Sequence, residues 1–175
     1  VQWHQEHVWD NVRVVRVPLY PSHDASAIRR ISNYASFAIS AAALGPFRVA
    51  RPDVIYVCHP PITVGLPAVV LAARFRCPFV YDVLDLWPES VDASGMMPRA
   101  LRAPLDAFCR WVYRRADRVV TLSPGMQALL QQKGVDPGRL SCIYNWCDET
   151  TLSGDGGREL LDGCRRDGEF IVLYA

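Results

Sequence analysis

Short apolar runs rich in β-branched residues recur along the chain and alternate with longer stretches of helical period. The runs predict strands at residues 12–17, 53–58, 79–83, 118–122, 140–144 and 170–174. The stretches between them predict helices at residues 26–44, 63–76, 98–116 and 124–133. Parallel strands need a long crossover, and helices of this length supply it. The alternation therefore predicts a doubly wound α/β domain, with a parallel sheet covered by helices on both faces.

Several helix boundaries carry their own sequence signals. Thr63 precedes a helix whose first turn contains Pro67, where the missing N–H costs little. Ser123 is a favoured N-cap residue before Pro124, and Gly134 is placed to end that helix. These signals support the helices at residues 63–76 and 124–133.

The sequence changes character after the strand predicted at residues 140–144. The run Ser153-Gly-Asp-Gly-Gly157 indicates a linker, and residues 159–166 predict a short helix. We therefore expect one Rossmann-like domain over residues 1–150, a linker and short helix over residues 151–168, and the first strand of a second domain over residues 169–175. Because Val1 opens mid-sequence and the chain stops in an apolar run, we expect a fragment.

Composition narrows the class of protein. Of the 175 residues, 50% are hydrophobic and 21% are charged, as in ordinary globular domains. The net charge of +1 supplies no global field that would attract nucleic acid. The six cysteines show no spacing typical of a zinc site or disulfide framework, so we expect no metal and a reducing compartment. No apolar run is long enough to span a membrane, which favours a cytoplasmic location.

Polar residues follow four of the predicted strands. They lie in the segments 59–61, 82–90, 123–124 and 145–148. Ligands of open α/β sheets collect at the carboxyl ends of the strands, so we expect these segments to share one edge of the sheet.

Two carboxylates lie within and just after the apolar run at residues 79–83, the third of the predicted strands. Asp82 and Asp85 are followed at once by Trp87 and by Glu89. A functional interpretation places Asp85, with Asp82 and Glu89 nearby, in a cleft where a carboxylate orients a substrate hydroxyl or accepts its proton. A structural interpretation makes Asp85 a loop carboxylate satisfied by backbone N–H groups, with Trp87 packed beneath it. The sequence leaves both open.

Two further polar residues stand at the same predicted edge. Ser123 is explained as a cap, although the start of its helix also offers N–H groups to an anion or a hydroxyl. His59 lies between the apolar strand and two prolines, and it is either a cleft residue or a satisfied polar residue.

The helix predicted at residues 98–116 has a basic face. Arg99, Arg110 and Arg114 fall opposite its apolar stripe, and Arg115 lies close by, beside Trp111. Such a face suits anionic lipid headgroups or a lipid-linked diphosphate. A face that is merely solvated is the alternative.

No P-loop, HExxH, GxSxG or GxGxxG motif occurs in the sequence, so phosphoryl transfer from ATP, zinc proteolysis and serine hydrolysis lose their simplest support. Four other segments do point to a family. They are the runs HPPIT at residues 59–63, YDVLDLWPES at 81–90, RVVTLSPGM at 118–126 and IYNWCD at 143–148. In order and spacing they resemble the family 4 retaining glycosyltransferases, and within them the bacterial exopolysaccharide, colanic-acid and O-antigen branch that includes N-acetyl-L-fucosamine transferases.

The resemblance implies a fold and a division of labour. It implies the amino-terminal, acceptor-side half of a GT-B fold, here without its first strand region. The second domain would hold a nucleotide-diphosphate sugar as donor substrate, with no cofactor. The acceptor would be a lipid-linked saccharide at the inner face of the cytoplasmic membrane. The alternatives are a GT-B sugar-nucleotide epimerase and a non-catalytic α/β ligand-binding module.

Individual roles are carried over by position. Asp85 matches the family's acidic residue after this strand, Ser123 matches its serine, and Asn145 with Asp148 matches its Asn-x-x-Asp pattern. Many members have His directly before the acid, whereas this chain has Leu84. The resemblance thus assigns catalysis to Asp85 and leaves open which residue, if any, serves in place of that His.

Overall fold

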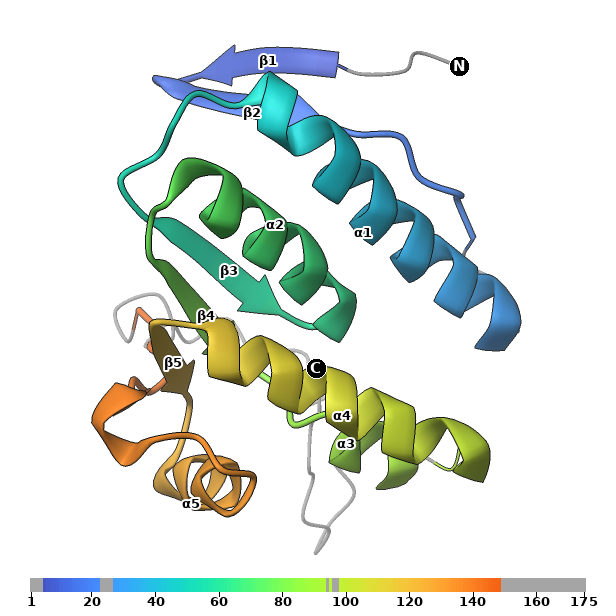
Figure 1. Ribbon diagram of the computed structural model, residues 1–175, viewed down its shortest axis with the longest axis vertical. Coiled ribbons are helices and arrows are strands. Elements are labelled where there is room, and N and C mark those ends of the chain that lie inside the picture. The colour runs from blue at the N-terminus through green and yellow to red at the C-terminus, as the bar shows by residue number, and fades with distance from the viewer. Residues whose placement is uncertain (1–4, 23–26, 94, 96–97, 149–175) are drawn as a thin grey trace, which may run out of the picture. The chain divides into compact units, whose positions relative to one another are not determined.

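The computed structural model describes residues 5–22, 27–93, 95 and 98–148 (Figure 1). The chain divides into two compact units, Val1–Tyr144 and Asn145–Ala175. All the helices and strands described lie in the first unit. The predicted linker, short helix and last strand, at residues 151–175, lie outside the described residues and stay predictions.

A four-stranded parallel sheet forms the centre of the first unit. Its strands, in spatial order, are β3 (Ile55–His59), β4 (Phe79–Val83), β5 (Arg118–Thr121) and β6 (Leu140–Cys142). Every neighbouring pair is parallel. The predicted α/β architecture with a parallel sheet is therefore confirmed, and each of these strands lies within a residue or two of its predicted range.

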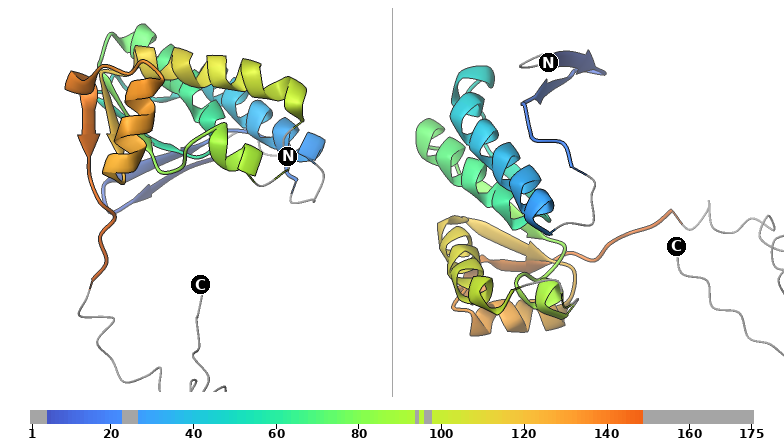
Figure 2. Two further views of the ribbon diagram at one scale, coloured as in Figure 1. Left: turned by 90° about the horizontal axis from the view of Figure 1, so that it is seen from below. Right: turned by 90° about the vertical axis from the view of Figure 1, so that its right-hand side faces the viewer.

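Helices connect consecutive strands of this sheet. They are α2 (Gly65–Phe75), preceded by the 3₁₀ turn η1 (Ile62–Val64), then α3 (Glu89–Ala93) and α4 (Arg99–Arg115), then α5 (Pro124–Gln132), followed by the 3₁₀ turn η2 (Pro137–Arg139). A longer helix, α1 (Ala27–Arg48), packs against α2 (Figures 1 and 2). The five-residue helix α3 was not among the elements predicted from the sequence.

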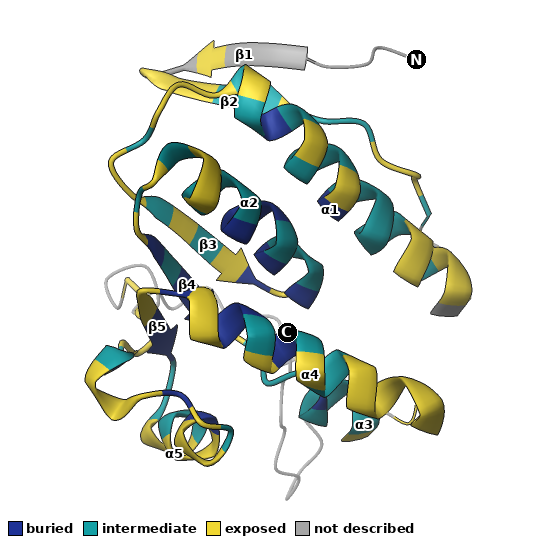
Figure 3. Cartoon of the chain, viewed as in Figure 1, coloured by how far each residue is buried: buried dark blue, intermediate teal, exposed yellow. Residues whose placement is uncertain are grey.

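The core lies on the helix-covered face of the sheet. Tyr81 and Val83 of β4 point to this face and pack with Val112 of α4 and Leu130 of α5, all of them buried. Figure 3 shows buried positions on α2 and α4. Right-handed crossovers between strands that are consecutive both in sequence and in space place all their helices on one face. On the other face Tyr56 of β3 is 59% exposed, and the second helical layer of a doubly wound domain is not among the described residues.

The amino-terminal strand lies outside the parallel sheet. The sequence predicts a strand at residues 12–17 as part of the parallel alternation, but β2 (Val12–Arg16) pairs antiparallel with β1 (Gln5–Trp9) in a separate hairpin. Asp10 (φ 44°) and Asn11 (φ 67°) form its two-residue turn in the left-handed region. That conformation matches the twist of an antiparallel pair.

The segment after the hairpin runs along α1 and is bonded to it. The backbone N–H of Tyr20 donates to Ser36 Oγ (2.8 Å), and Asn33 Nδ2 donates to the Tyr20 carbonyl (2.7 Å). One turn further on, Ser40 Oγ donates to the carbonyl of Pro18 (2.5 Å). Small polar side chains on one face of α1 thus fix the path of the chain that leads into it.

Close packing between helices depends on two glycines. Gly45 lies inside α1, where a Cβ atom would come within 3.3 Å of Leu71 Cδ2 on α2. Gly65 begins α2, where a Cβ atom would come within 2.6 Å of Val112 Cγ2 on α4. The predicted end of the first helix at Leu44 was therefore too early, because Gly45 serves as a contact point and not as a stop.

The predicted cap of α5 is confirmed. Ser123 has extended backbone geometry, and its Oγ accepts a hydrogen bond from Met126 N–H (3.2 Å). Gly134 follows this helix with φ 89°, a conformation that glycine adopts without a steric cost. At α2 the expectation was wrong in detail, because Thr63 lies in η1 and Val64, which cannot cap, directly precedes the helix.

Candidate functional site

The carboxyl ends of the four parallel strands meet at one edge of the sheet, as expected. The segment of residues 84–90 follows the inner strand β4 at this edge and leads into α3. Leu84 N–H donates to the His59 carbonyl at the end of β3 (3.0 Å), and Ile143 N–H donates to the Thr121 carbonyl at the end of β5 (2.9 Å). The backbone thus links the ends of neighbouring strands.

Asp85 is held in one orientation by two side chains. Trp87 Nε1 donates to its Oδ2 at 3.1 Å, and Ser90 Oγ donates to the same oxygen at 2.9 Å. The donors are side chains, and not the backbone N–H groups of the structural interpretation. No described residue donates to Oδ1 of this half-buried carboxylate. Two described side chains thus anchor one oxygen of the carboxylate.

His59 lies behind this carboxylate in the core. Its ring is wholly buried, stacked on Tyr81 (centroids 5.9 Å apart) and edge-on to Trp87 (5.7 Å). Neither ring nitrogen has a hydrogen-bond partner among the described residues. Burial lowers the pKa of His59, although nearby backbone groups and the charge of Asp85 act against the shift. The neutral ring therefore packs edge-on against Trp87 within the core and does not reach the surface.

Asp82 faces away from the helices. Successive strand residues point to opposite faces, and Asp82 lies between two core residues of β4, so its side chain is on the other face of the sheet. There it is 8% exposed and accepts a hydrogen bond from Tyr56 Oη, which together with burial raises the pKa of Tyr56 to about 12. Leu84 is 39% exposed at the end of the same strand. Asp82 and Asp85 are thus not brought together on one face.

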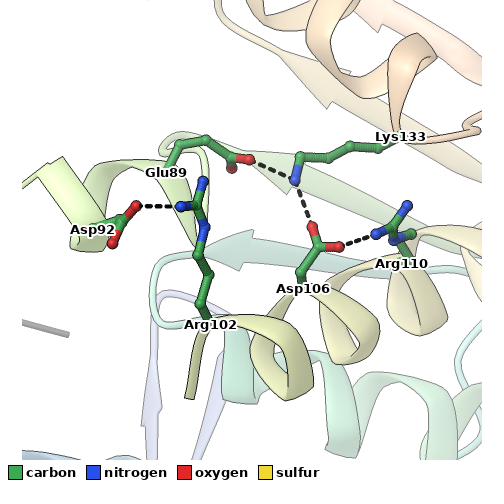
Figure 4. Close-up of polar contacts among 6 residues, drawn as sticks. All are labelled: Glu89, Asp92, Arg102, Asp106, Arg110 and Lys133. Atoms are coloured by element: carbon green, nitrogen blue, oxygen red, sulfur yellow. Dashed lines mark hydrogen bonds and ion pairs between the residues drawn. The ribbon is translucent and has the colours of Figure 1, made fainter. Parts of the chain in front are cut away.

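Glu89 belongs to a partly buried charge cluster. Its Oε1 lies 2.6 Å from the Nζ of Lys133, which also contacts Asp106 Oδ1 at 2.7 Å (Figure 4). Asp106 pairs in turn with Arg110. Burial alone would raise the pKa of Asp106 and lower that of Lys133, but their mutual contact reverses both shifts. The cluster ties α3, α4 and the end of α5 together, and Figure 4 shows a second tie between α3 and α4, Asp92 with Arg102 (3.0 Å).

The remaining predicted cleft residues follow β5 and β6 along the chain. Ser123 is half-buried at the start of α5, where its hydroxyl is already used as the cap. Asn145 and Asp148 are exposed and belong to the second compact unit. Their part in a common site stays a prediction.

The basic residues of α4 differ in their surroundings. Arg110 is paired with Asp106, and the guanidinium of Arg115 lies 5.4 Å from the centre of the Trp111 ring. Arg99 and Arg114 are exposed at opposite ends of the helix. No helix in the described part of the chain has the length and apolarity needed to cross a bilayer.

A cavity of about 570 Å³ adjoins the site and was not predicted from the sequence. It lies among α1, η1 with α2, α3 and α4, and the ring of Trp87 forms part of its wall. Its residues come from segments far apart in the sequence, so no local pattern signals it. Within the described residues, no group of three or more His, Cys, Asp or Glu side chains is placed to hold a metal ion.

Comparison with known proteins settles the family. The family model described as "Glycosyl transferase 4-like domain" matches residues 2–146, which include the whole sheet and the Asp85 site. The chain belongs to this family. The resemblance to family 4 glycosyltransferases is therefore confirmed at the level of the family and of a glycosyltransferase domain.

Two relatives extend the comparison of this glycosyl transferase 4-like chain. It is 28% identical over 129 residues to "Probable glycosyltransferase WbjE" of Pseudomonas aeruginosa, covering 72% of this chain and 30% of the relative. Its fold matches the crystal structure of Anabaena Alr3699/HepE in complex with UDP and glucose, with a TM-score of 0.51 and 14% identity, over 81% of this chain and 35% of the other. The chain thus spans about a third of each, and the likeness to HepE shows the fold alone.

Proposed function

We propose that this chain is the acceptor-side domain of a retaining glycosyltransferase with a GT-B fold. The enzyme would move a sugar from a nucleotide-diphosphate donor to a lipid-linked saccharide in cell-surface polysaccharide synthesis, as the enzymes of the N-acetyl-L-fucosamine transferase branch do. The reaction would take place at the inner face of the cytoplasmic membrane. No cofactor is needed in this proposal, and the nucleotide sugar is a substrate.

The proposal rests mainly on the family match, since it covers residues 2–146 and thus contains the anchored carboxylate of Asp85. The name of the relative WbjE supports sugar transfer, and the complex of HepE with UDP and glucose is consistent with a nucleotide-sugar donor.

The geometry of Asp85 suits a role toward a sugar hydroxyl. Trp87 and Ser90 hold Oδ2, so the plane of the carboxylate is fixed before substrate arrives. A hydroxyl that donates to Oδ1 would then be oriented without further ordering of the side chain. In this proposal the negative charge of the carboxylate would also stabilise the positive charge that develops on a sugar ring in the transition state of transfer.

The donor diphosphate needs a different set of groups. Its leaving charge calls for cations and N–H dipoles, and the proposal assigns these to a second domain. A domain that supplies only the acceptor side is expected to transfer no sugar by itself. Asn145 and Asp148 are proposed to contact substrate as well, as the resemblance to the family implies.

The test is an activity assay on the full-length protein. Radiolabelled nucleotide sugars are supplied with a lipid-linked saccharide extract, and the product is analysed for the configuration of the new glycosidic bond. The proposal predicts labelled lipid product with the configuration of the donor. Epimerised nucleotide sugar without an acceptor would identify an epimerase instead, and saccharide binding without any turnover would identify a binding module. Either result would overturn the proposal.

A further inference from the structure

The short helix α3 depends on its neighbours for its position. It has five residues, Glu89–Ala93, and none of them is buried. A helix of this length is not stable by itself, because it forms too few hydrogen bonds to offset the cost of ordering its first turn. Its position in the fold is therefore set by the side chains that join it to longer elements.

Two ion pairs among the described residues join α3 to those elements, and they differ in exposure. Glu89 Oε1 lies 2.6 Å from Lys133 Nζ, and these side chains are 40% and 12% exposed. Asp92 Oδ2 lies 3.0 Å from Arg102 Nη1, and these side chains are 35% and 59% exposed. An exposed pair contributes little, because water screens it and both long side chains lose freedom. The pair of Glu89 with the shielded Lys133 is therefore the stronger attachment of α3.

Lys133 is itself held in place where α5 ends. Its N–H donates to the Leu129 carbonyl (3.1 Å), and Leu130, one residue further along the helix, is wholly buried. Its ammonium lies 2.7 Å from Asp106 Oδ1 on α4, and Figure 4 shows the ammonium between the carboxylates of Asp106 and Glu89. Asp106 thus fixes the ammonium at the point from which it reaches α3.

Glu89 needs this cation to keep its place. Its Oε2 is buried and has no hydrogen-bond partner among the described residues. A carboxylate in such surroundings is costly unless a charge compensates it. Without Lys133 the side chain of Glu89 is expected to turn toward water, and the first turn of α3, which Glu89 begins, would shift with it.

The same turn of α3 holds the Asp85 carboxylate. Ser90, the residue after Glu89, donates from its Oγ to Asp85 Oδ2 at 2.9 Å. The backbone N–H of Ser90 donates to the Leu86 carbonyl (2.8 Å), so its hydroxyl follows the backbone of this turn. Hydrogen bonds weaken steeply as their geometry departs from linear, so a shift of the turn loosens the carboxylate. The contacts thus run from Lys133 through Glu89 and Ser90 to Asp85.

We propose that Lys133 is a positioning residue for Asp85 and acts on it through Glu89 and Ser90. Lys133 does not touch the substrate in this role, because it only fixes the turn from which Ser90 holds the carboxylate. The effect on sugar transfer rests on the proposed function, whereas the link between Lys133 and Asp85 is a property of the fold alone.

Steady-state kinetics of the full-length protein test the effect on transfer. Lys133→Met keeps an unbranched side chain and removes the cation. It should lower kcat by about tenfold, and by no more than Ser90→Ala does, with KM for the nucleotide sugar unchanged. In a Ser90→Ala background it should add less than about a twofold loss, because the hydrogen bond through which it acts is already gone. The full loss in both backgrounds would overturn the proposal.

Glu89→Gln tests the middle of this series of contacts. It keeps the length of the side chain but loses the charge that pairs with Lys133. It should reproduce the loss in kcat of Lys133→Met, and the double variant should lose no more than either single one. A loss in Glu89→Gln with wild-type kcat in Lys133→Met would mean that Glu89 acts on the substrate directly, and would refute the role of Lys133.

Two controls separate positioning from a general loss of stability. Gln132→Met changes the exposed neighbouring residue and should keep the wild-type kcat. Val119→Ala truncates a wholly buried side chain of β5 that has no part in these contacts. It should lower the denaturation midpoint and keep the wild-type kcat. A fall in kcat as large as that of Lys133→Met would assign both effects to stability and contradict the positioning role.

Fluorine NMR gives a readout that does not need turnover. The full-length protein is labelled with fluorotryptophan, and the signals of Trp87 and Trp111 are assigned by their absence in the Trp87→Phe and Trp111→Phe variants. Lys133→Met and Ser90→Ala should both shift the Trp87 signal, since Trp87 donates to the same carboxylate oxygen as Ser90. The Trp111 signal should stay in place.

The two readouts fail separately. A shifted Trp87 signal in a protein that transfers no sugar would support the link from Lys133 to Asp85 although the proposed function had failed. A Trp87 signal that Lys133→Met leaves in place, in a protein that does transfer sugar, would overturn the link and uphold the proposed function.

Discussion

Trp87 donates its indole N–H to Oδ2 of Asp85 at 3.1 Å, while the same ring lines the apolar cavity and packs edge-on against buried His59. Trp87 therefore contacts a buried histidine, a half-buried carboxylate and a hydrocarbon-lined space. The position of Asp85 depends on the packing around that ring, and not only on the turn in which it lies.

Removing the indole N–H should loosen Asp85 without emptying the site. Trp87→Phe keeps an aromatic ring against His59 but loses the donor, and Ser90→Ala removes the second donor. A hydrogen bond to a charged group is worth about 1.5–3 kcal/mol, so each variant should lower kcat of the full-length protein by about ten- to a hundredfold. In an Asp85→Asn background the same substitutions should add little further loss, because the carboxylate that they position is gone.

The matched control for the indole variant is Trp111→Phe. Trp111 stacks with Phe108 and Arg115 on α4 and has no described contact with Asp85. Its kcat should equal that of the wild type. If Trp87→Phe also retained the full wild-type kcat, the positioning role of the indole would be refuted.

Lys133, the only lysine in the sequence, should stabilise the fold through its two carboxylate partners. Lys133→Met leaves Asp106 without its ammonium partner and should lower the free energy of unfolding by about 1–3 kcal/mol. Gln132→Met, at the exposed neighbouring position, is the control. Urea unfolding at neutral pH measures both, and equal losses in the two variants would contradict a special role for Lys133.

The same cluster should make stability depend on acid pH. Burial raises the pKa of Asp106, but Lys133 and Arg110 outweigh it, so the folded-state pKa lies below the ordinary 3.8. Stability from this group is therefore present above 3.8 and is lost as pH falls through the lower folded-state value. The Lys133→Met variant should lose less free energy of unfolding than the wild type between neutral and acid pH. An equal loss would show that the pair does not control the acid transition.

Gly65 should tolerate no larger side chain, because a Cβ atom there would lie 2.6 Å from Val112 Cγ2. Gly65→Ala is expected to destabilise the protein by about 1–3 kcal/mol, and Val112→Ala in the same chain should recover part of the loss. Gly125→Ala is the control, since its nearest neighbour would be Ser123 Oγ at 3.9 Å. Chemical denaturation midpoints give the comparison, and a Gly65→Ala midpoint at or above that of the wild type would disprove the close approach of α2 and α4.

The basic end of α4 is predicted to contact anionic lipid. Arg114→Gln with Arg115→Gln removes two charges near Trp111, while Arg110 is left in its ion pair. Each charge near an anionic surface contributes on the order of 1 kcal/mol, so cosedimentation with anionic liposomes should weaken by more than tenfold. The pair Arg51→Gln and Arg74→Gln, both exposed, removes the same net charge elsewhere. Equal weakening by both pairs would point to net charge alone and exclude a specific basic face.

Most of the parallel sheet could be predicted from the sequence because its strands are short apolar runs bounded by turn residues. Ser123 and Gly134 marked α5 correctly for the same reason, since capping is local chemistry. Only the second strand of the hairpin was predicted, because β1 begins with polar residues. The pair Asp10-Asn11, two residue types that tolerate the left-handed conformation of a hairpin turn, was the sequence signal for the first strand.

Asp85 could be picked out as a candidate from the sequence, but its surroundings could not. Asp85 is marked by a carboxylate directly after a buried strand, but the bonds from Trp87 and Ser90 depend on the turn into α3. The separation of Asp82 from Asp85 follows from the alternation of side chains between the two faces of a strand, because the two residues are three positions apart. The contact of Glu89 with Lys133 joins residues 44 positions apart, and only the tertiary fold brings them together.

The role of Asp85 in sugar transfer is tested most directly by comparing Asp85→Asn with Asp53→Asn in the full-length protein. Asp53 is exposed next to the start of β3, at the opposite edge of the sheet. The initial rate of sugar transfer to the lipid-linked acceptor is measured for both variants, with their unfolding free energies as a check on folding. If Asp85 acts on the substrate, Asp85→Asn should lose about a hundredfold or more in rate, and Asp53→Asn should keep the wild-type rate. A wild-type rate in a folded Asp85→Asn variant would contradict that role.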